Sequence, residues 1–315
     1  MSEASPRAVV VVTGPTAAGK SFVAIELAER FGGEIVNADS MQVYRLLDVG
    51  TAKPSNAERA RVPHHLFDVV DPDVQYDAGR YACEAAEAVE RIHARGRPAF
   101  VVGGSGLYIK ALLEGLSVGV GRDAELRRTL EEEDQRARAQ GDPERLHRRL
   151  QEIDPSAARA LHPNDRVRLV RALELHAATG IAPSVIQRRS GQQRPWRVVQ
   201  LALDPGRDAL KLRIDQRCAD MIAGGLLQEV RRLRDLGYGP ELPSMRAIGY
   251  RHMQPVIDGV ETLVGVLEEM KRDTRRFARR QRTWLRGVAG VEWMTPEPIE
   301  ALLLRTKRFL EGELA

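Results

Sequence analysis

The stretch AVVVVTGPTAAGKSFVAIELAERF, residues 8–31, decides the fold. Its first six residues, 8–13, are apolar or β-branched throughout, which is typical of a strand buried on both faces. A turn with two glycines follows, and residues 22–31 then place apolar side chains at helical spacing. A buried strand that leads through a turn into a helix is the repeating unit of a parallel α/β sheet, so the stretch predicts that class of fold.

Residues 14–21, GPTAAGKS, fit the pattern G-x-x-x-x-G-K-[ST] between a strand and a helix. Glycines let backbone N–H groups approach phosphate oxygens without a Cβ in the way, and the helix N-terminus adds partial positive charge. The lysine supplies a cation, and the serine hydroxyl can bind Mg²⁺. We predict a phosphate loop that binds a diphosphate or triphosphate through Gly14, Thr16, Ala17, Ala18, Gly19, Lys20 and Ser21, with Ser21 as the Mg²⁺ ligand. A glycine turn that only caps the helix is the alternative.

Outward from this stretch, strands and helices are predicted to alternate. Further strands are expected at 34–38, 98–102 and 197–203, and helices at 80–95, 107–113, 208–236 and 262–286. The segment 119–193 is charged and helical with no strand signal, and Gly180 is placed to end its last helix. The predicted fold is α/β, with a P-loop NTPase-like parallel sheet core formed by 1–118 and 194–315 and a helical insertion domain at 119–193.

The composition excludes several classes of protein. Of the 315 residues, 43% are hydrophobic and 29% are charged, which indicates a globular chain rather than a disordered one. Two isolated cysteines, Cys83 and Cys218, exclude a disulfide framework and a cysteine-based zinc site. Apolar runs stay short of the roughly 18 residues of a membrane span, and the first residues show no signal-peptide pattern. We expect a cytoplasmic monomer that does not associate with membranes.

Two further loops follow predicted strands. One is DSMQVY, residues 39–44, and the other is GGSGLY, residues 103–108. Because ligands of open α/β sheets lie beyond the carboxyl ends of the strands, both loops are expected beside the phosphate loop. There the carboxylate of Asp39 can act as a general base and the hydroxyl of Ser105 can orient an acceptor. A helix N-cap is the alternative role for Asp39.

Other polar residues give weaker signals. A carboxylate at the end of an apolar strand, as a hydrolysing ATPase needs, is not obvious, and Asp68 and Asp71 are only weak candidates. The adjacent pair His64 and His65 points in two directions, so these residues are predicted to be loop or packing residues rather than metal ligands.

Residues 271–286 read KRDTRRFARRQRTWLR, with eight basic residues and one acid. At helical spacing a largely apolar stripe is expected to pack on the core; it comprises Leu267, Met270, Thr274, Phe277, Gln281 and Trp284. The arginines outside the stripe lack local acids, which favours an RNA or DNA backbone as partner over a solvated face. Aromatic residues make up only 5% of the chain, so extended base stacking is not expected.

Eight separated motifs together resemble one family, the tRNA dimethylallyltransferases, also called tRNA isopentenyltransferases. They are GPTAAGKS (14–21), ADSMQVY (38–44), GTAKP (50–54), VPHHL (62–66), GGSGLY (103–108), HPNDRVRLVRALE (162–174), SMRAIGYR (244–251) and RRQRTWLR (279–286). Two positions depart from the family pattern: Ser105 stands where threonine is common, which keeps a hydroxyl, and Arg166-Val167 stands where Pro-Gln is frequent.

The resemblance implies transfer of a dimethylallyl group from dimethylallyl diphosphate to N6 of adenine 37 in tRNAs that read codons beginning with U. The products would be N6-(dimethylallyl)adenosine and diphosphate, the cofactor Mg²⁺, and the partner the tRNA anticodon stem-loop. Asp39 would be the base, Ser105 would orient the amine, and Arg213 or Arg217 would clamp the diphosphate. The residues implied to contact tRNA are Asp39, Ser40, Met41, Gln42, Ser105, Arg127, Pro163, Asn164, Asp165, Arg166, Val167, Arg246, Gly249, Tyr250, Arg251, Arg279, Arg280, Gln281, Arg282, Trp284 and Arg286.

Two alternative functions share parts of these signals. A P-loop small-molecule or nucleotide kinase would need the phosphate loop and the sheet but not the basic helix. A non-catalytic RNA-binding module would need the basic helix but not the carboxylate of Asp39.

Overall fold

The computed structural model describes residues 7–115, 123–189 and 194–313. These residues form two compact units, of which the first comprises Met1–Leu112 and Pro195–Ala315 and the second Leu113–Arg194. The predicted domain boundaries, after residues 118 and 193, adjoin or lie in segments outside the described residues.

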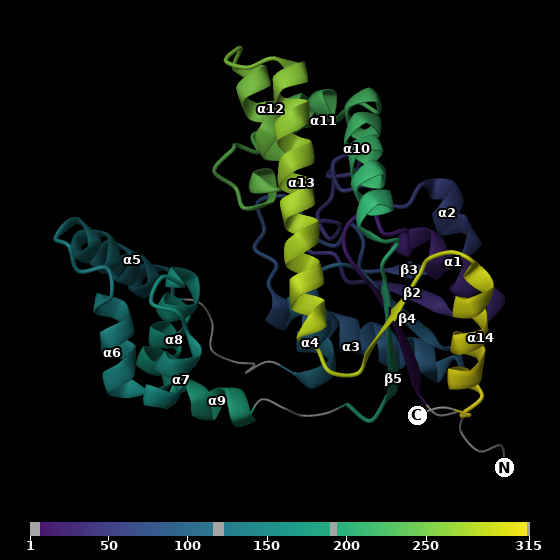
Figure 1. Cartoon of the computed structure of the whole chain (residues 1–315), viewed down its shortest axis with the longest axis horizontal. Coiled ribbons are helices and arrows are strands. Elements are labelled where there is room, and N and C mark those ends of the chain that lie inside the picture. Colours follow the sequence, from purple (N-terminus) through teal and green to yellow (C-terminus); the bar gives the residue numbers. More distant parts are fainter. Residues whose placement is uncertain (1–6, 116–122, 190–193, 314–315) are drawn as a thin grey trace. The chain divides into compact units, whose positions relative to one another are not determined.

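The first unit is built on a six-stranded, wholly parallel sheet in the order β3-β2-β4-β1-β5-β6 (Figure 1). The strands are β1 (Ala8–Thr13), β2 (Glu34–Asn37), β3 (His64–His65), β4 (Ala99–Val102), β5 (Arg197–Leu203) and β6 (Val291–Met294). The predicted α/β class and the parallel sheet are confirmed, and the four predicted strands are all present.

Two strands were not predicted. The pair His64–His65 forms the edge strand β3 beside β2, where loop or packing residues were expected. Strand β6 adds to the opposite edge, paired with β5, in a region where no strand was predicted. Both strands are short and only partly buried, so neither carries the apolar run that marks the inner strands.

Helices of the first unit surround the sheet. They are α1 (Lys20–Arg30), α2 (Asn56–Arg61), α3 (Ala78–Ala94), α4 (Gly106–Glu114, which ends in the second unit), α10 (Arg207–Ala223), α11 (Leu226–Asp235), the 3₁₀ turn η1 (Ser244–Arg246), α12 (Tyr250–Ile257), α13 (Leu263–Arg286) and α14 (Ile299–Leu310). The single helix predicted over 208–236 is wrong, because Gly225 adopts a left-handed φ of 96° and separates α10 from α11.

Strand β1 is buried on both faces, as the sequence predicts. Val10 and Val12 join a core cluster with residues of α1 and α14, whereas Val9 and Val11 point to the opposite face, because successive side chains of a strand alternate. On its apolar side α3 buries a row of alanines together with Val89 and Ile92. None of the described helices is long and apolar enough to cross a membrane.

The second unit is a helical bundle with a core of its own. Its helices are α5 (Ala124–Ala139), α6 (Arg145–Ile153), α7 (Pro155–Ala160), α8 (Arg166–Thr179) and α9 (Pro183–Arg189), and its described residues contain no strand, in agreement with the prediction. Leucines of α5, α6 and α8 fill the centre, among them Leu130, Leu150 and Leu169. Gly180 ends α8 in the left-handed conformation, as predicted.

A buried carboxylate anchors the amino end of the sheet. Glu34 opens β2 with its side chain only 2% exposed, and it pairs with Arg95, Arg97 and His65. Burial alone would raise the pKa of Glu34, but the hydrogen bonds and charges of Arg95 and His65 prevail and lower the pKa to about 2. His65 is therefore an ion-pair partner of Glu34 at this edge of the sheet.

We predict that Glu34→Gln destabilises the protein at neutral pH. A carboxyl pKa lowered from 4.5 to about 2 gives stability that is present above about pH 4.5 and lost as the pH falls toward 2. At neutral pH the loss should be roughly 2 kcal/mol after solvent screening of the arginines. Urea unfolding at pH 7 and at pH 2.5 measures it; an equal gap between wild type and variant at both pH values would contradict the prediction.

Candidate active site

The carboxyl ends of β1, β2, β4 and β5 lie at one edge of the sheet, because these neighbours are parallel. The loops that follow them therefore meet: 14–19, 38–44, 103–106 and 204–206. The backbones approach closely, since the Ala38 N–H donates to the Val102 carbonyl over 2.7 Å. A Cβ at Gly103 would lie 2.1 Å from the Ala38 carbonyl oxygen, so only glycine fits there.

The phosphate loop has the conformation that its glycines predict. Gly14 has a φ of 136°, and a Cβ there would lie 2.5 Å from the Leu203 carbonyl oxygen of β5. Gly19 has a φ of 91° and leads directly into α1. Lys20 Nζ donates to the Pro15 carbonyl over 2.7 Å, and Ser21 is exposed in the first turn of the helix. Backbone N–H groups, a lysine and a hydroxyl thus surround the N-terminus of α1.

Three charged side chains interact at this edge. Burial lowers the pKa of Lys20 to about 8, an effect that the carboxylate of Asp39 opposes and the guanidinium of Arg217 reinforces. Burial also lowers the pKa of Arg217, and Asp39 again opposes this. Two partly desolvated cations therefore face one carboxylate, an arrangement in which an added anion would be stabilised.

Both arginines considered for the diphosphate clamp come from α10 and lie near the phosphate loop. Arg213 has its guanidinium 3.5 Å from the position of a Cβ on Gly19, and it pairs with Glu297 over 3.0 Å. Arg217 donates to the Thr51 carbonyl over 3.2 Å and interacts electrostatically with Lys20 and Asp39. The geometry is compatible with either residue, or both, as a ligand of a diphosphate.

Asp39 is held by the turn that it begins. Its N–H donates to Asn37 Oδ1 over 2.9 Å, and its Oδ1 accepts from the Met41 N–H over 2.9 Å. Residues 39–44 form turns rather than a helix, so Asp39 is not a helix N-cap. Within the described part of the chain, no hydrogen bond reaches its Oδ2, which leaves that oxygen able to accept a proton.

Ser105 is hydrogen-bonded to Ser40, the residue that follows Asp39. Its Oγ accepts from the Ser40 N–H over 2.9 Å and donates to Ser40 Oγ over 3.1 Å. The Ser105 N–H donates to the Ala38 carbonyl over 3.1 Å. The carboxylate and the hydroxyl predicted from separate motifs are therefore brought together at the ends of β2 and β4.

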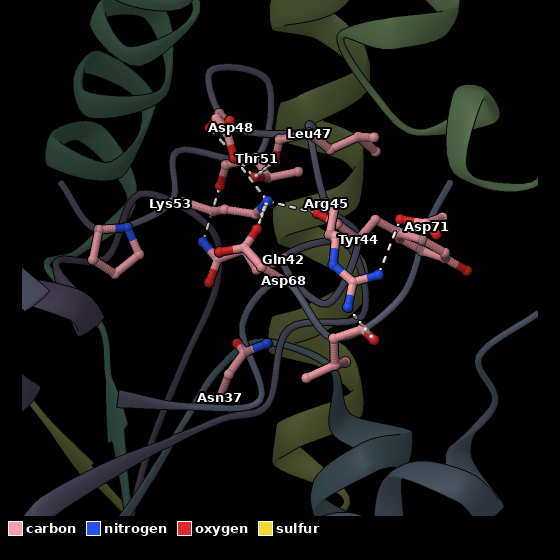
Figure 2. Close-up of polar contacts among 12 residues, drawn as sticks. Asn37, Gln42, Tyr44, Arg45, Leu47, Asp48, Thr51, Lys53, Asp68 and Asp71 are labelled. Carbon is pink, nitrogen blue, oxygen red and sulfur yellow. Dashed lines mark hydrogen bonds and ion pairs between the residues drawn. The ribbon is translucent and has the colours of Figure 1, made fainter. Parts of the chain in front are cut away.

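The loop 42–53 is organised around Lys53 (Figure 2). Its ammonium, on a side chain only 3% exposed, donates to the Tyr44 carbonyl, to Asp48 and to Asp68 over 2.6–2.8 Å. Gln42, implied by the resemblance to contact tRNA, instead donates to the carbonyls of Thr51 and Ala52. The buried lysine thus fixes the loop that supplies the Thr51 carbonyl to Arg217.

The two weak candidates for an ATPase carboxylate are neutralised. Asp68 pairs with Lys53 and with Arg59, and Asp71 pairs with Arg45 over 3.0 Å. Figure 2 shows the pairs Lys53–Asp68 and Arg45–Asp71. In the described residues, no group of three histidine, cysteine or carboxylate side chains could hold a metal ion.

Glu229 of α11 is a residue that the sequence analysis missed. Its carboxylate accepts the N–H groups of Asp48, Val49 and Gly50 over 2.8–3.1 Å and the Tyr250 hydroxyl over 2.6 Å. A Cβ on Gly50 would lie 2.4 Å from the Tyr250 ring, which explains that glycine. Two of its partners, Gly50 and Tyr250, lie in the motifs GTAKP and SMRAIGYR, but nothing in the sequence distinguishes Glu229 from other helix glutamates.

Helix α13 corrects the expectation that its arginines lack acidic partners. Acids distant in sequence pair with Arg275 (Asp215) and Arg282 (Asp204, 2.7 Å), and nearby acids pair with Arg272 and Arg276. Across the described chain, no acid pairs with a second group of exposed arginines, which comprises Arg246, Arg279, Arg280 and Arg286.

The predicted apolar stripe is also displaced in part, because Val266, Ala278 and Leu285 are buried while Phe277 is 37% exposed.

The other residues implied to contact tRNA have varied surroundings. Gly249 and Tyr250 are buried, and Arg251 pairs with Asp273. The ring of Trp284 packs against Gly106, so closely that a Cβ on that glycine would lie 2.3 Å from the ring. In the second unit, Arg127 pairs with Glu131 and Glu174, and Arg166 pairs with Asp134. In the loop that begins at Pro163, the Asn164 N–H donates to His162 Nδ1. Asp165 caps α8 by accepting from the Arg168 N–H, and the side chain of Val167 is 68% exposed.

Comparison with known proteins identifies the family. The family model described as IPP transferase matches residues 42–288, and a model described as isopentenyl transferase matches residues 7–67. The chain belongs to the IPP transferase family. Among relatives, the "tRNA dimethylallyltransferase" of Desulfatibacillum aliphaticivorans is 46% identical over 308 residues, which cover 98% of this chain and 99% of the relative. The protein of that name from Anaeromyxobacter sp. (strain Fw109-5) is 50% identical over 293 residues, which cover 93% and 95% of the two chains.

Solved structures of IPP transferases share the fold. The full-length tRNA isopentenylpyrophosphate transferase of Bacillus halodurans superposes with a TM-score of 0.71 at 36% identity, covering 97% of both chains. A eukaryotic dimethylallyltransferase acting on tRNA superposes with a TM-score of 0.80 at 29% identity, covering 96% of this chain and 79% of that one.

We predict that Glu229→Gln loosens the loop 48–50 of this IPP transferase. Glutamine has one acceptor oxygen fewer and turns an NH₂ group toward backbone donors, which leaves at least one amide unsatisfied at a cost of about 1–3 kcal/mol. Hydrogen exchange at residues 48–50 should accelerate at least about tenfold for the same reason. Asp235→Asn, an exposed change on the same helix, is the control; unchanged exchange in the Glu229 variant would contradict the assigned role.

Proposed function

We propose that this protein is a tRNA dimethylallyltransferase that prenylates N6 of adenine 37 in tRNAs reading codons that begin with U, with dimethylallyl diphosphate as the donor. The observation that supports it best is the shared location of a phosphate loop, the cations Lys20 and Arg217, and the carboxylate of Asp39. Family membership favours this activity over both the kinase and the non-catalytic RNA-binding module.

In this proposal the phosphate loop holds the donor's diphosphate, which is the leaving group. Backbone N–H groups at the N-terminus of α1, together with Lys20 and the α10 arginines, supply positive charge where negative charge develops as the C–O bond breaks. The exposed Ser21 hydroxyl, a hard oxygen ligand, fits Mg²⁺, and the bound ion would help to neutralise the departing diphosphate.

The acceptor is the exocyclic amine of the adenine, a weak nucleophile because its lone pair is delocalised into the ring. As the new C–N bond forms, the amine must lose a proton, and Oδ2 of Asp39 is the group that receives it. The Ser105 hydroxyl, two residues from Gly103 at the end of β4, orients the amine. Since a stacked base cannot reach this edge of the sheet, the adenine is extruded from its loop before reaction.

The tRNA is proposed to bind through cations that have no acidic partner within the described chain. These exposed arginines are Arg246, Arg279, Arg280 and Arg286. Phosphate groups would supply the negative charge that the described chain does not offer them. We further propose that the protein acts as a monomer in the cytoplasm.

Prenyl transfer itself is the primary test, together with the role of Asp39. Incubation with dimethylallyl diphosphate, Mg²⁺ and unmodified tRNA should yield prenylated adenosine, detected by mass. In Asp39→Asn transfer should fall at least about 10³-fold, because the proton acceptor is lost, while tRNA affinity stays near wild type. Asp77→Asn, which alters a helix cap outside the site, is the control; wild-type turnover in the Asp39 variant would refute the base role.

We also predict a pH effect that originates in Lys20. Because the pKa of Lys20 is about 8, its charge is present below this pH and is lost as the pH rises through it. Affinity for inorganic diphosphate should therefore be about tenfold weaker at pH 9 than at pH 7. Lys20→Arg, which stays charged, should not show this loss, and the ionisation of diphosphate itself affects both proteins equally. The same decline in both proteins would show that another group titrates.

Salt dependence tests the proposed tRNA surface. Replacement of Arg279 and Arg286 together by glutamine should weaken tRNA binding and reduce the slope of log K against log salt by about 1–2. Arg282 is left out of the pair because Asp204 already neutralises it. Arg308→Gln on α14 is the control, and a slope identical to that of the control would remove these arginines from the interface.

A further inference from the structure

Gln281 of α13 connects two loops of the active site that are remote in sequence. Its Oε1 accepts from the Thr16 N–H of the phosphate loop over 2.8 Å. Its Nε2 donates to the Gly104 carbonyl, directly before Ser105, over 2.9 Å. The orientation of the amide is determined by these partners, because only its oxygen can face the N–H donor and only its NH₂ can face the carbonyl.

The surrounding residues leave room for this side chain. A Cβ on Gly104 would lie 2.3 Å from Gln281 Nε2, so the glycine admits the amide. Trp284, three residues further along α13 and on the same face of the helix, fills the space over Gly106. Helix α13 therefore closes on both loops through consecutive inward positions, and in Figure 1 its C-terminal end lies beside α4.

We propose that Gln281 is a positioning residue that sets the distance between the phosphate loop and Ser105, rather than a residue that contacts tRNA. The inference rests on the proposed function, in which the first loop holds the donor and the second orients the acceptor. Reacting atoms must approach within about 3–3.5 Å, and a displacement of about 1 Å can lower a rate about 10²-fold. A side chain that ties both loops together is placed to control that approach.

The contact also has a consequence for donor binding. The Thr16 N–H belongs to the phosphate loop, and its bond to Gln281 keeps it in a fixed direction. Loss of the bond frees this backbone segment, so the variant must order it again when diphosphate binds. Donor affinity and turnover should therefore both depend on Gln281, whereas tRNA affinity should not.

The direct test is Gln281→Met, because methionine is similar in volume to glutamine but can form neither of the two hydrogen bonds. We expect kcat to fall about 10–100-fold and the Kd of Mg²⁺-supported inorganic diphosphate to rise about 3–10-fold. The Kd of tRNA should stay within about twofold of wild type, since no contact with tRNA is removed. Gln281→Glu keeps the acceptor for Thr16 but turns an oxygen toward Gly104, so its kcat should also fall while its thermal midpoint reports folding.

Val264→Ala, an exposed change on the same helix, is the matched control for general effects on α13. A tRNA Kd that rises while the diphosphate Kd is unchanged would overturn the proposal and assign Gln281 to the RNA interface. Wild-type values of all three quantities in Gln281→Met would overturn it as well. Failure of the proposed function would be seen separately, as an absence of prenylated adenosine from the wild-type protein, and the diphosphate measurement does not depend on that assay.

Discussion

Parallel pairing of β2, β4, β1 and β5 is the constraint on which the site depends. It brings the ends of four strands to one edge and leaves so little space between the backbones that Gly14 and Gly103 tolerate no side chain. The phosphate loop, the carboxylate and the hydroxyl therefore lie at the same edge of the sheet, and Gln281 links the phosphate loop to the loop that carries Ser105. The chemistry is carried by loops, but their meeting point is set by hydrogen bonds of the sheet.

Much of this could be predicted from the sequence, for identifiable reasons. The strand 8–13 and the phosphate loop carry strong local signals, because an apolar run and two glycines in positive φ each need particular residue types. The convergence of Asp39 and Ser105 follows from topology once the strands are known to be parallel. The edge strands β3 and β6 carry no such signal, since short and partly exposed strands need no continuous apolar run.

Contacts between distant segments were the part that sequence reasoning could not supply. The arginines of α13 look unpaired when only neighbours along the helix are counted, yet Asp204 and Asp215 neutralise two of them from other elements. Glu229 is equally invisible, because a carboxylate that accepts three backbone N–H groups is an ordinary helix residue in the sequence. A charge pattern indicates a surface only after these long-range partners have been subtracted.

The environment of Lys53 has a chemical consequence. All three N–H bonds of its ammonium are occupied, and only 3% of the side chain meets solvent. An acylating reagent needs a free, deprotonated amine, so this lysine should be spared as long as the loop around it stays closed. The rate of its modification would therefore measure how often the loop opens locally, and this measurement needs neither substrate nor turnover.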